Sequence, residues 1–298
     1  MTHPEWLWMV FTVLAAAAQV ARNAMQRELT GTLGTVGATH VRFLFGFPFA
    51  VLFLVVLLTV TGESFPHISA GFWPWVLLGA LTQIAATALM LAAMGERSFV
   101  VATAYIKTEP VQVALFGLIF LGDRISLPVA AAILIATTGV VAMSWKPNRG
   151  AEGGAKPMVL GLTAGAFFAL SAIGYRGAIL TVNAEFVMAA TSTLAIGLAV
   201  QAALLSLYLA VRQRGVLVAI ARAWRPSLFA GMMGAVASQF WFLSFALTSA
   251  ANVRTLALVE VLFAQGISHF IFKQPVTARD MMGIALIIAG VLLLIWAH

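Results

Sequence analysis

The sequence contains no cysteine and very little charge. Without cysteine, disulfide bonds, thiolate nucleophiles and cysteine-ligated metal sites are excluded. Only 9% of the residues are charged and 62% are hydrophobic, whereas a typical soluble domain has about 25% charged residues. So few charges cannot cover a water-facing surface, and the mean hydropathy of +1.00 agrees. The composition therefore predicts an integral membrane protein.

Catalytic and nucleotide-binding motifs are also missing. The sequence has no His-Glu-x-x-His, no Gly-x-Ser-x-Gly, no Walker loop and no His and carboxylate cluster spaced for a metal. We therefore expect no enzyme, no metal and no cofactor, and any pumping must draw on an ion or solute gradient. The net charge of +7 does not indicate nucleic acid, because Lys and Arg in short loops set membrane topology and meet lipid headgroups.

Apolar runs of about 20 residues recur along the chain, which is the length a helix needs to cross a bilayer. Glycine, proline and polar residues separate them, as around Gly34, Gly62 and the segment 122–128. We predict ten transmembrane helices, at 5–24, 35–60, 72–93, 98–121, 127–146, 157–180, 185–211, 226–247, 252–272 and 277–297. The first run follows no basic segment and has full span length, so we expect a retained helix rather than a signal peptide.

The segments 89–146 and 240–297 match each other at an offset of 151 residues. The coinciding pairs are Ser98 with Ser249, Glu109 with Glu260, Ile133 with Ile284, Gly139 with Gly290 and Trp145 with Trp296. Because each half holds an odd number of spans, the second copy enters the membrane in the opposite direction. We predict an all-α integral membrane fold of two inverted five-helix repeats around a central cavity, residues 1–146 and 158–298, joined by the linker 147–157.

The distribution of Lys and Arg predicts the orientation. The loops after the odd-numbered spans hold twelve of these residues, and the opposite side holds three at most. Positive residues remain on the cytoplasmic side, so the linker should be cytoplasmic and both termini periplasmic.

Polar side chains stand out in the fourth predicted span. An ionised side chain at mid-bilayer costs about 2.5–3.5 kcal/mol, so it needs a partner or a wet cavity. Tyr105, Lys107 and Glu109 lie close together, and Pro110 predicts a kink because it leaves the carbonyl of Ile106 without its helical donor. Lys107 and Glu109 point to different faces of one helix and cannot pair well there. They could line a cavity or tie two helices together, and we favour the cavity.

The ninth predicted span carries a second set. Glu260 is the repeat mate of Glu109, and this symmetry indicates matched roles as gate ties or proton-linked groups. Arg254 near the start of the span either snorkels or binds, and a lone histidine such as His269 is more often structural. His40 and Arg42 open the second span, where snorkelling is favoured. Further candidates for a central site are Gln83 in the third span and Gln239 and Trp241 in the eighth.

The Glu109-Pro110 pair, the following Gly122-Asp123 and Gly139 form a pattern that Glu260 and Gly290 partly repeat. On these residues the chain resembles the drug/metabolite transporter superfamily, and within it the EamA-type exporters. The second half departs from the pattern, with Val261 for proline and Lys273-Gln274 for the Gly-acidic pair. More narrowly, the chain is similar to YddG-type exporters of aromatic and other amino acids. The resemblance implies a basket of ten helices with a cavity lined by the first, third, fourth, sixth, eighth and ninth.

We therefore expect a secondary transporter of the bacterial inner membrane that exports small metabolites, above all aromatic or other neutral amino acids, by alternating access. Lys107 and Arg254 would meet a substrate carboxylate, with further contacts from Gln83, Tyr105, Gln239 and Trp241. Glu109, Glu260 and His269 would support gating or proton coupling, and Pro110 would act as a hinge. The alternatives are an uncoupled facilitator, an exporter of drugs or other metabolites, and, less favoured, an intramembrane enzyme. Beyond the substrate we expect contact with membrane lipid and none with nucleic acid, and a monomer would suffice for a complete pathway.

Overall fold

The computed structural model describes residues 4–94, 105–144, 156–270, 273 and 276–297. Within these ranges the chain is almost entirely helical and has no β-strand. Seven helices of this part are long and apolar enough to cross a membrane, and two shorter apolar helices, 109–121 and 127–143, accompany them. The chain is therefore a multi-pass helical membrane protein, as expected, while the count of ten spans stays a prediction.

Most helices begin and end within a few residues of the predicted spans. After α1 (Leu7–Thr61) they are α2 (Phe72–Met94), α4 (Glu109–Phe116), the π-helix η1 (Gly117–Leu121), α5 (Leu127–Ser144), α6 (Lys156–Thr181), α7 (Phe186–Arg212), α8 (Arg214–Arg222), α9 (Trp224–Leu247), α10 (Ala250–Leu256), α11 (Val259–Phe270) and α12 (Ala278–Ala297). The predicted linker falls largely outside the described residues. α8 was not predicted, because its nine residues are too short and too basic for a span.

The first two predicted spans both belong to α1 and are joined by a sharp turn at Gly34. The glycines after the first span had suggested a longer loop. Only Gly34, with φ 68° and ψ 174°, leaves the helical conformation within α1. Gln26 Nε2 donates to the carbonyl of Ala38 at 3.0 Å. Twelve residues of straight helix extend about 18 Å, so this bond requires the chain to reverse at Gly34. Glycine reaches this positive φ without steric cost, which is why one residue suffices for the turn.

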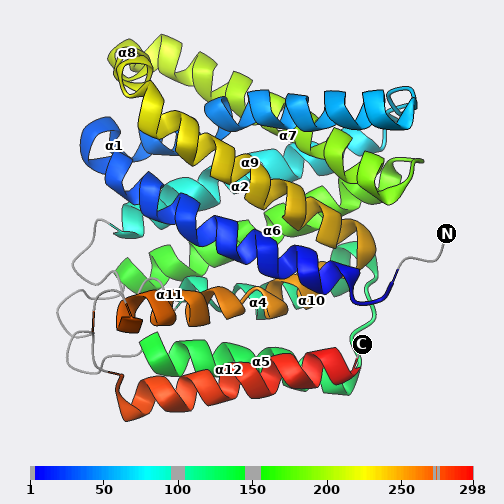
Figure 1. The fold of residues 1–298 in the computed structure, drawn as a ribbon, viewed down its shortest axis with the longest axis vertical. Helices are drawn as coiled ribbons and strands as arrows, with labels where there is room; N and C mark the ends of the chain where they lie inside the picture. The colour runs from blue at the N-terminus through cyan, green and yellow to red at the C-terminus, as the bar shows by residue number, and fades with distance from the viewer. Residues whose placement is uncertain (1–3, 95–104, 145–155, 271–272, 274–275, 298) are drawn as a thin grey trace. The chain divides into compact units, whose positions relative to one another are not determined.

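The chain folds into two compact units, and each unit contains segments from both halves of the sequence. Unit 1 comprises Met1–Ile84 and Gly174–Leu247, and unit 2 comprises Ala85–Ile173 and Thr248–His298. In unit 1, α1 packs against α7, α8 and α9. In unit 2, α5 lies beside α12, and α10 lies beside α4 (Figure 1). Each unit therefore draws helices from both predicted repeats.

Repeat-related glycines allow α5 and α12 to approach closely. A Cβ at Gly139 would lie 2.7 Å from the carbonyl oxygen of Gly283, and a Cβ at Gly290 would lie 2.7 Å from the Cβ of Ala136. Ala136 and Ile287 are fully buried in this contact. Small residues bring membrane helices into backbone contact, so the matched Gly139 and Gly290 serve packing in unit 2.

Candidate functional site

The two polar spans are both interrupted near the middle. In the first half, helical structure is present at Ile106, a turn follows at 107–108, and α4 begins at Glu109. In the second half, α10 ends at Leu256, a turn follows at 257–258, and α11 begins at Val259. An offset of 151 places residues 107–108 on 258–259, so the two breaks coincide within one residue. Discontinuous helices of this kind form the ion and substrate sites of many secondary transporters.

Different local chemistry produces the two breaks. Pro110 occupies the first turn of α4, where its missing N–H costs little. The chain before it is tightened by bonds from the Thr108 backbone N–H and hydroxyl to the carbonyl of Tyr105, at 3.2 and 2.7 Å. The second break has no proline and is closed by similar short-range bonds, such as Glu260 N–H to Ala257 at 3.0 Å. The break before Pro110 lies where the kink was predicted, whereas the second break was not predicted.

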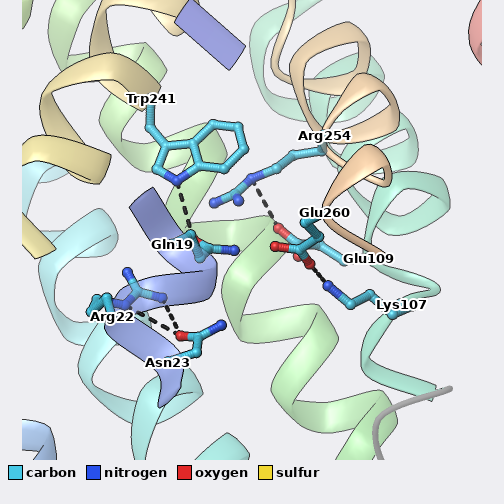
Figure 2. A network of polar contacts seen from close by, with 8 residues as sticks. All are labelled: Gln19, Arg22, Asn23, Lys107, Glu109, Trp241, Arg254 and Glu260. Atoms are coloured by element: carbon cyan, nitrogen blue, oxygen red, sulfur yellow. Dashed lines mark hydrogen bonds and ion pairs between the residues drawn. The ribbon is translucent and has the colours of Figure 1, made fainter. Parts of the chain in front are cut away.

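Four charged side chains at these breaks form two ion pairs, and we call Lys107, Glu109, Arg254 and Glu260 the charge cluster (Figure 2). Lys107 pairs with Glu260. Arg254 Nε lies 3.0 Å from Glu109 Oε1. Each cation therefore pairs with the carboxylate of the other repeat. The pairs join elements of the two repeats, as the predicted inter-helix tie would, and the cavity wall stays a prediction.

The four side chains of the charge cluster are mostly buried, and their formal charges sum to zero. The exposed side-chain fractions are 21% for Lys107, 8% for Glu260, 10% for Arg254 and 14% for Glu109. Pairing offsets the cost of placing each ion in a membrane helix. Both carboxylates also lie in the first turn of a helix, where the partial positive charge of the helix end favours an anion.

The other predicted residues of unit 2 lie on the same elements. Tyr105 is half-buried and Pro110 is buried. The side chain of His269 is outside the described part of the structure. Gln112 donates from Nε2 to Thr108 at 3.1 Å, and its buried amide oxygen accepts no hydrogen bond from the described residues. Gln112 belongs to the polar stretch of the fourth predicted span with Tyr105, Lys107 and Glu109, although it was not among the predicted site residues.

The remaining predicted residues lie in unit 1. Gln83 Oε1 accepts hydrogen bonds from the Tyr175 hydroxyl at 3.3 Å and from Gln201 Nε2 at 2.9 Å. Gln201 also donates to the carbonyl of Ala80 at 3.1 Å. All three polar side chains are buried. Gln83 is thus part of an internal hydrogen-bonded network that joins α2, α6 and α7.

Gln239 and Trp241 each bond to a different helix of unit 1. Trp241 Nε1 donates to Gln19 Oε1 at 3.1 Å (Figure 2). Gln239 Nε2 donates to Thr191 Oγ1 at 2.8 Å. The amide oxygen of Gln239 is buried and accepts no hydrogen bond among the described residues, so it can receive one from a bound molecule.

Two residues expected to snorkel are buried instead. His40 is 0% exposed and its Nε2 lies 3.0 Å from Ser206 Oγ. Arg42 is 3% exposed, and its stem and that of Arg22 both approach Gly234 of α9. The expectation was wrong because α7 and α9 pack over this arm of α1, which local sequence does not reveal.

The fold and the charge cluster define a class: helical membrane proteins with paired discontinuous helices that carry charge, as in secondary transporters. The EamA-like transporter family matches the chain twice, over residues 6–145 and 155–296. The chain belongs to this family and contains two of its repeats, so it is a membrane transporter. A solved crystal structure aligns with 97% of this chain and 95% of its own, with a TM-score of 0.72 at 13% identity, and shares the fold. No curated protein matches the sequence. The resemblance to EamA-type proteins is confirmed, and the YddG-type subgroup stays a prediction.

Proposed function

We propose that this transporter exports small metabolites, with amino acids as the substrate class, by alternating access of its two repeats. The observation that carries the proposal is the charge cluster at the two helix breaks. It supplies both signs of charge, and a free amino acid carries both signs on two groups attached to the same carbon atom. Family membership supports transport as such, and the chemistry of the cluster supports the substrate class.

A zwitterion can replace the internal ion pairs without changing the total charge. The substrate carboxylate would take the place of Glu260 at Lys107 or of Glu109 at Arg254. Its ammonium group would then meet the released glutamate. A substrate with a net negative charge would instead leave one charge unpaired within the membrane, which is costly. The cluster therefore favours neutral zwitterions over anions.

Gln239 and Trp241 are two further residues that the sequence predicts as substrate contacts. The buried amide oxygen of Gln239 can accept a hydrogen bond from an ammonium group. Trp241 is 3% exposed and stacks on Phe245, so it would contact a substrate side chain only after these helices move. In unit 2, Tyr105 and Gln112 would add polar contacts. Gln83 is less suited to substrate, because Tyr175 and Gln201 already occupy its amide oxygen.

The two helix breaks would also allow the conformational change that alternating access requires. The turns at 107–108 and 257–258 allow the two parts of each broken helix to tilt separately. The two ion pairs of the charge cluster would hold these parts in place until a substrate carboxylate displaces a glutamate. Pro110 would assist as a hinge, and Glu109 and Glu260 could carry protons once unpaired. The excess of Lys and Arg in the loops supports an inner-membrane location with a cytoplasmic linker and periplasmic termini.

Counterflow in proteoliposomes tests the proposal. Vesicles loaded with unlabelled neutral amino acids should accumulate one labelled amino acid, and Lys107→Ala should abolish this while the purified protein stays monodisperse. Lys273→Ala is the matched control, since this exposed lysine lies outside the cluster. Accumulation of drugs or other metabolites but of no amino acid would contradict the substrate class.

Coupling is tested by the pH profile of the same flux. If Glu109 and Glu260 carry protons, Glu109→Gln and Glu260→Gln should change the dependence of transport on pH. An unchanged profile with substantial flux would identify an uncoupled facilitator and leave the glutamates a purely structural role.

A further inference from the structure

The connection between α7 and α9 has a basic outer face. Because α7 and α9 both cross the membrane, α8 between them lies at one membrane surface. The segment 212–225 contains four arginines and no acidic residue, and the arginines are all exposed: Arg212, Arg214, Arg222 and Arg225. On its inner face Ile220 is 1% exposed, and Val216 packs toward Gly37 of α1. α8 is thus an amphipathic surface helix with cations on its outer side.

A pocket of about 470 Å³ lies between α8 and the first arm of α1. Its walls are mainly apolar, and its charged lining residues are Arg222 of α8 and Glu28 of α1. This volume is within the range of pockets that bind small molecules, about 300–1,000 Å³. The apolar lining residues include Met25, Leu29, Leu33, Val218 and Pro226.

We propose that this pocket binds an anionic phospholipid, with an acyl chain against the apolar wall and the headgroup phosphate at Arg222. Arginine binds phosphate oxygens in a bidentate manner, and basic pockets between membrane helices on the cytoplasmic side bind acidic headgroups. The pocket itself holds one arginine and one carboxylate, Arg222 and Glu28, and the other three exposed arginines of the segment 212–225 make the surrounding surface basic. This site shares no residue with the charge cluster and goes beyond the transport function.

The neighbouring Trp224 supports this placement of the headgroup. Its side chain is 51% exposed, and the guanidinium of Arg225 lies 5.4 Å from the ring centroid. Tryptophan collects at the level of lipid headgroups, so Trp224 indicates that the neighbouring Arg222 and Arg225 lie at the depth of the phosphates. A zwitterionic lipid would fill the apolar wall equally well but would offer no net charge to the arginines.

Thermal unfolding of the purified full-length protein in detergent tests the site. Phosphatidylglycerol should raise the Tm more than phosphatidylcholine does. Arg222→Gln should remove at least half of that difference, and Glu28→Gln should increase it. Arg124→Gln is the control, because Arg124 is an exposed arginine on a loop of unit 2 and does not line the pocket, and it should leave the difference unchanged.

The proposal is overturned if both lipids raise the Tm equally, or if Arg222→Gln responds like the unsubstituted protein. It is also overturned if inorganic phosphate alone reproduces the shift, since the site would then bind a free anion. Should Arg222→Gln fail to fold, Ala219→Trp provides an independent variant, because it fills the pocket and retains every arginine. The phosphatidylglycerol effect should be lost there as well.

Discussion

Lys107 and Glu260 form an ion pair. The loss of stability in a double variant should therefore differ from the sum of the losses in the two single variants. Glu260 is 8% exposed, so replacing Lys107 leaves a carboxylate that water reaches poorly. Removing one partner of a fully buried pair costs about 3–5 kcal/mol, whereas surface pairs contribute about 0–1. Since Lys107 is 21% exposed, the cost should fall between these limits.

We therefore expect Lys107→Met and Glu260→Met each to lower the Tm, and the double variant to recover part of the loss. The recovery follows because no unpaired ion remains in the double variant. Thermal unfolding of the three purified variants measures it. Losses that simply add would show that the two side chains do not interact.

At the scale of the elements, the contact between α5 and α12 depends on the absence of side chains. Gly139→Ala places a methyl group 2.7 Å from the backbone oxygen of Gly283, and a backbone cannot move aside as a flexible side chain can. We expect a loss of about 1–3 kcal/mol of stability, typical of overpacking. Gly266→Ala in α11 meets nothing within 4 Å and should leave stability equal or slightly higher. Comparing the Tm of the two variants checks this, and equal effects would contradict it.

The break before α4 allows a separate test of the hinge. The second break forms without proline, so we expect Pro110→Ala to fold with little change in Tm. Alanine restores an N–H that can bond across the break toward Ile106, and a stiffer helix should transport more slowly. The initial rate of counterflow measures this. Pro128→Ala is the matched control, because Pro128 lies in the first turn of α5 with no break beside it. Equal counterflow rates in the two variants would show that Pro110 does not act as a hinge.

For the whole molecule, the absence of cysteine makes topology directly measurable. Gln213→Cys lies beside α8 and Ser64→Cys lies in the loop after α1, and both positions are exposed. The excess of Lys and Arg predicts that residue 213 faces the cytoplasm and residue 64 the periplasm. A membrane-impermeant maleimide added to intact cells should label Ser64→Cys and not Gln213→Cys. The reverse result would invert the orientation and place the basic face of α8 in the periplasm.

The class of protein, the positions of most helices and the charged residues of the site were predictable from the sequence alone. Hydrophobic length, glycine and proline breakers and the duplication are local or periodic signals, and they placed α2, α5, α7 and α12 within a few residues. Lys107, Glu109, Arg254 and Glu260 were recognisable because a charge within an apolar run is costly and therefore needs a role.

Which of these charges pair with one another depends on how the helices pack. Lys107 and Glu260 are about 150 residues apart, and nothing local selects a crossed pairing over a cavity wall. The reversal at Gly34, the break at Ala257 and the burial of Arg42 likewise depend on neighbours distant in sequence. Pairing and burial are properties of surfaces that come together when helices pack, and the composition of one helix does not specify the face its neighbour presents.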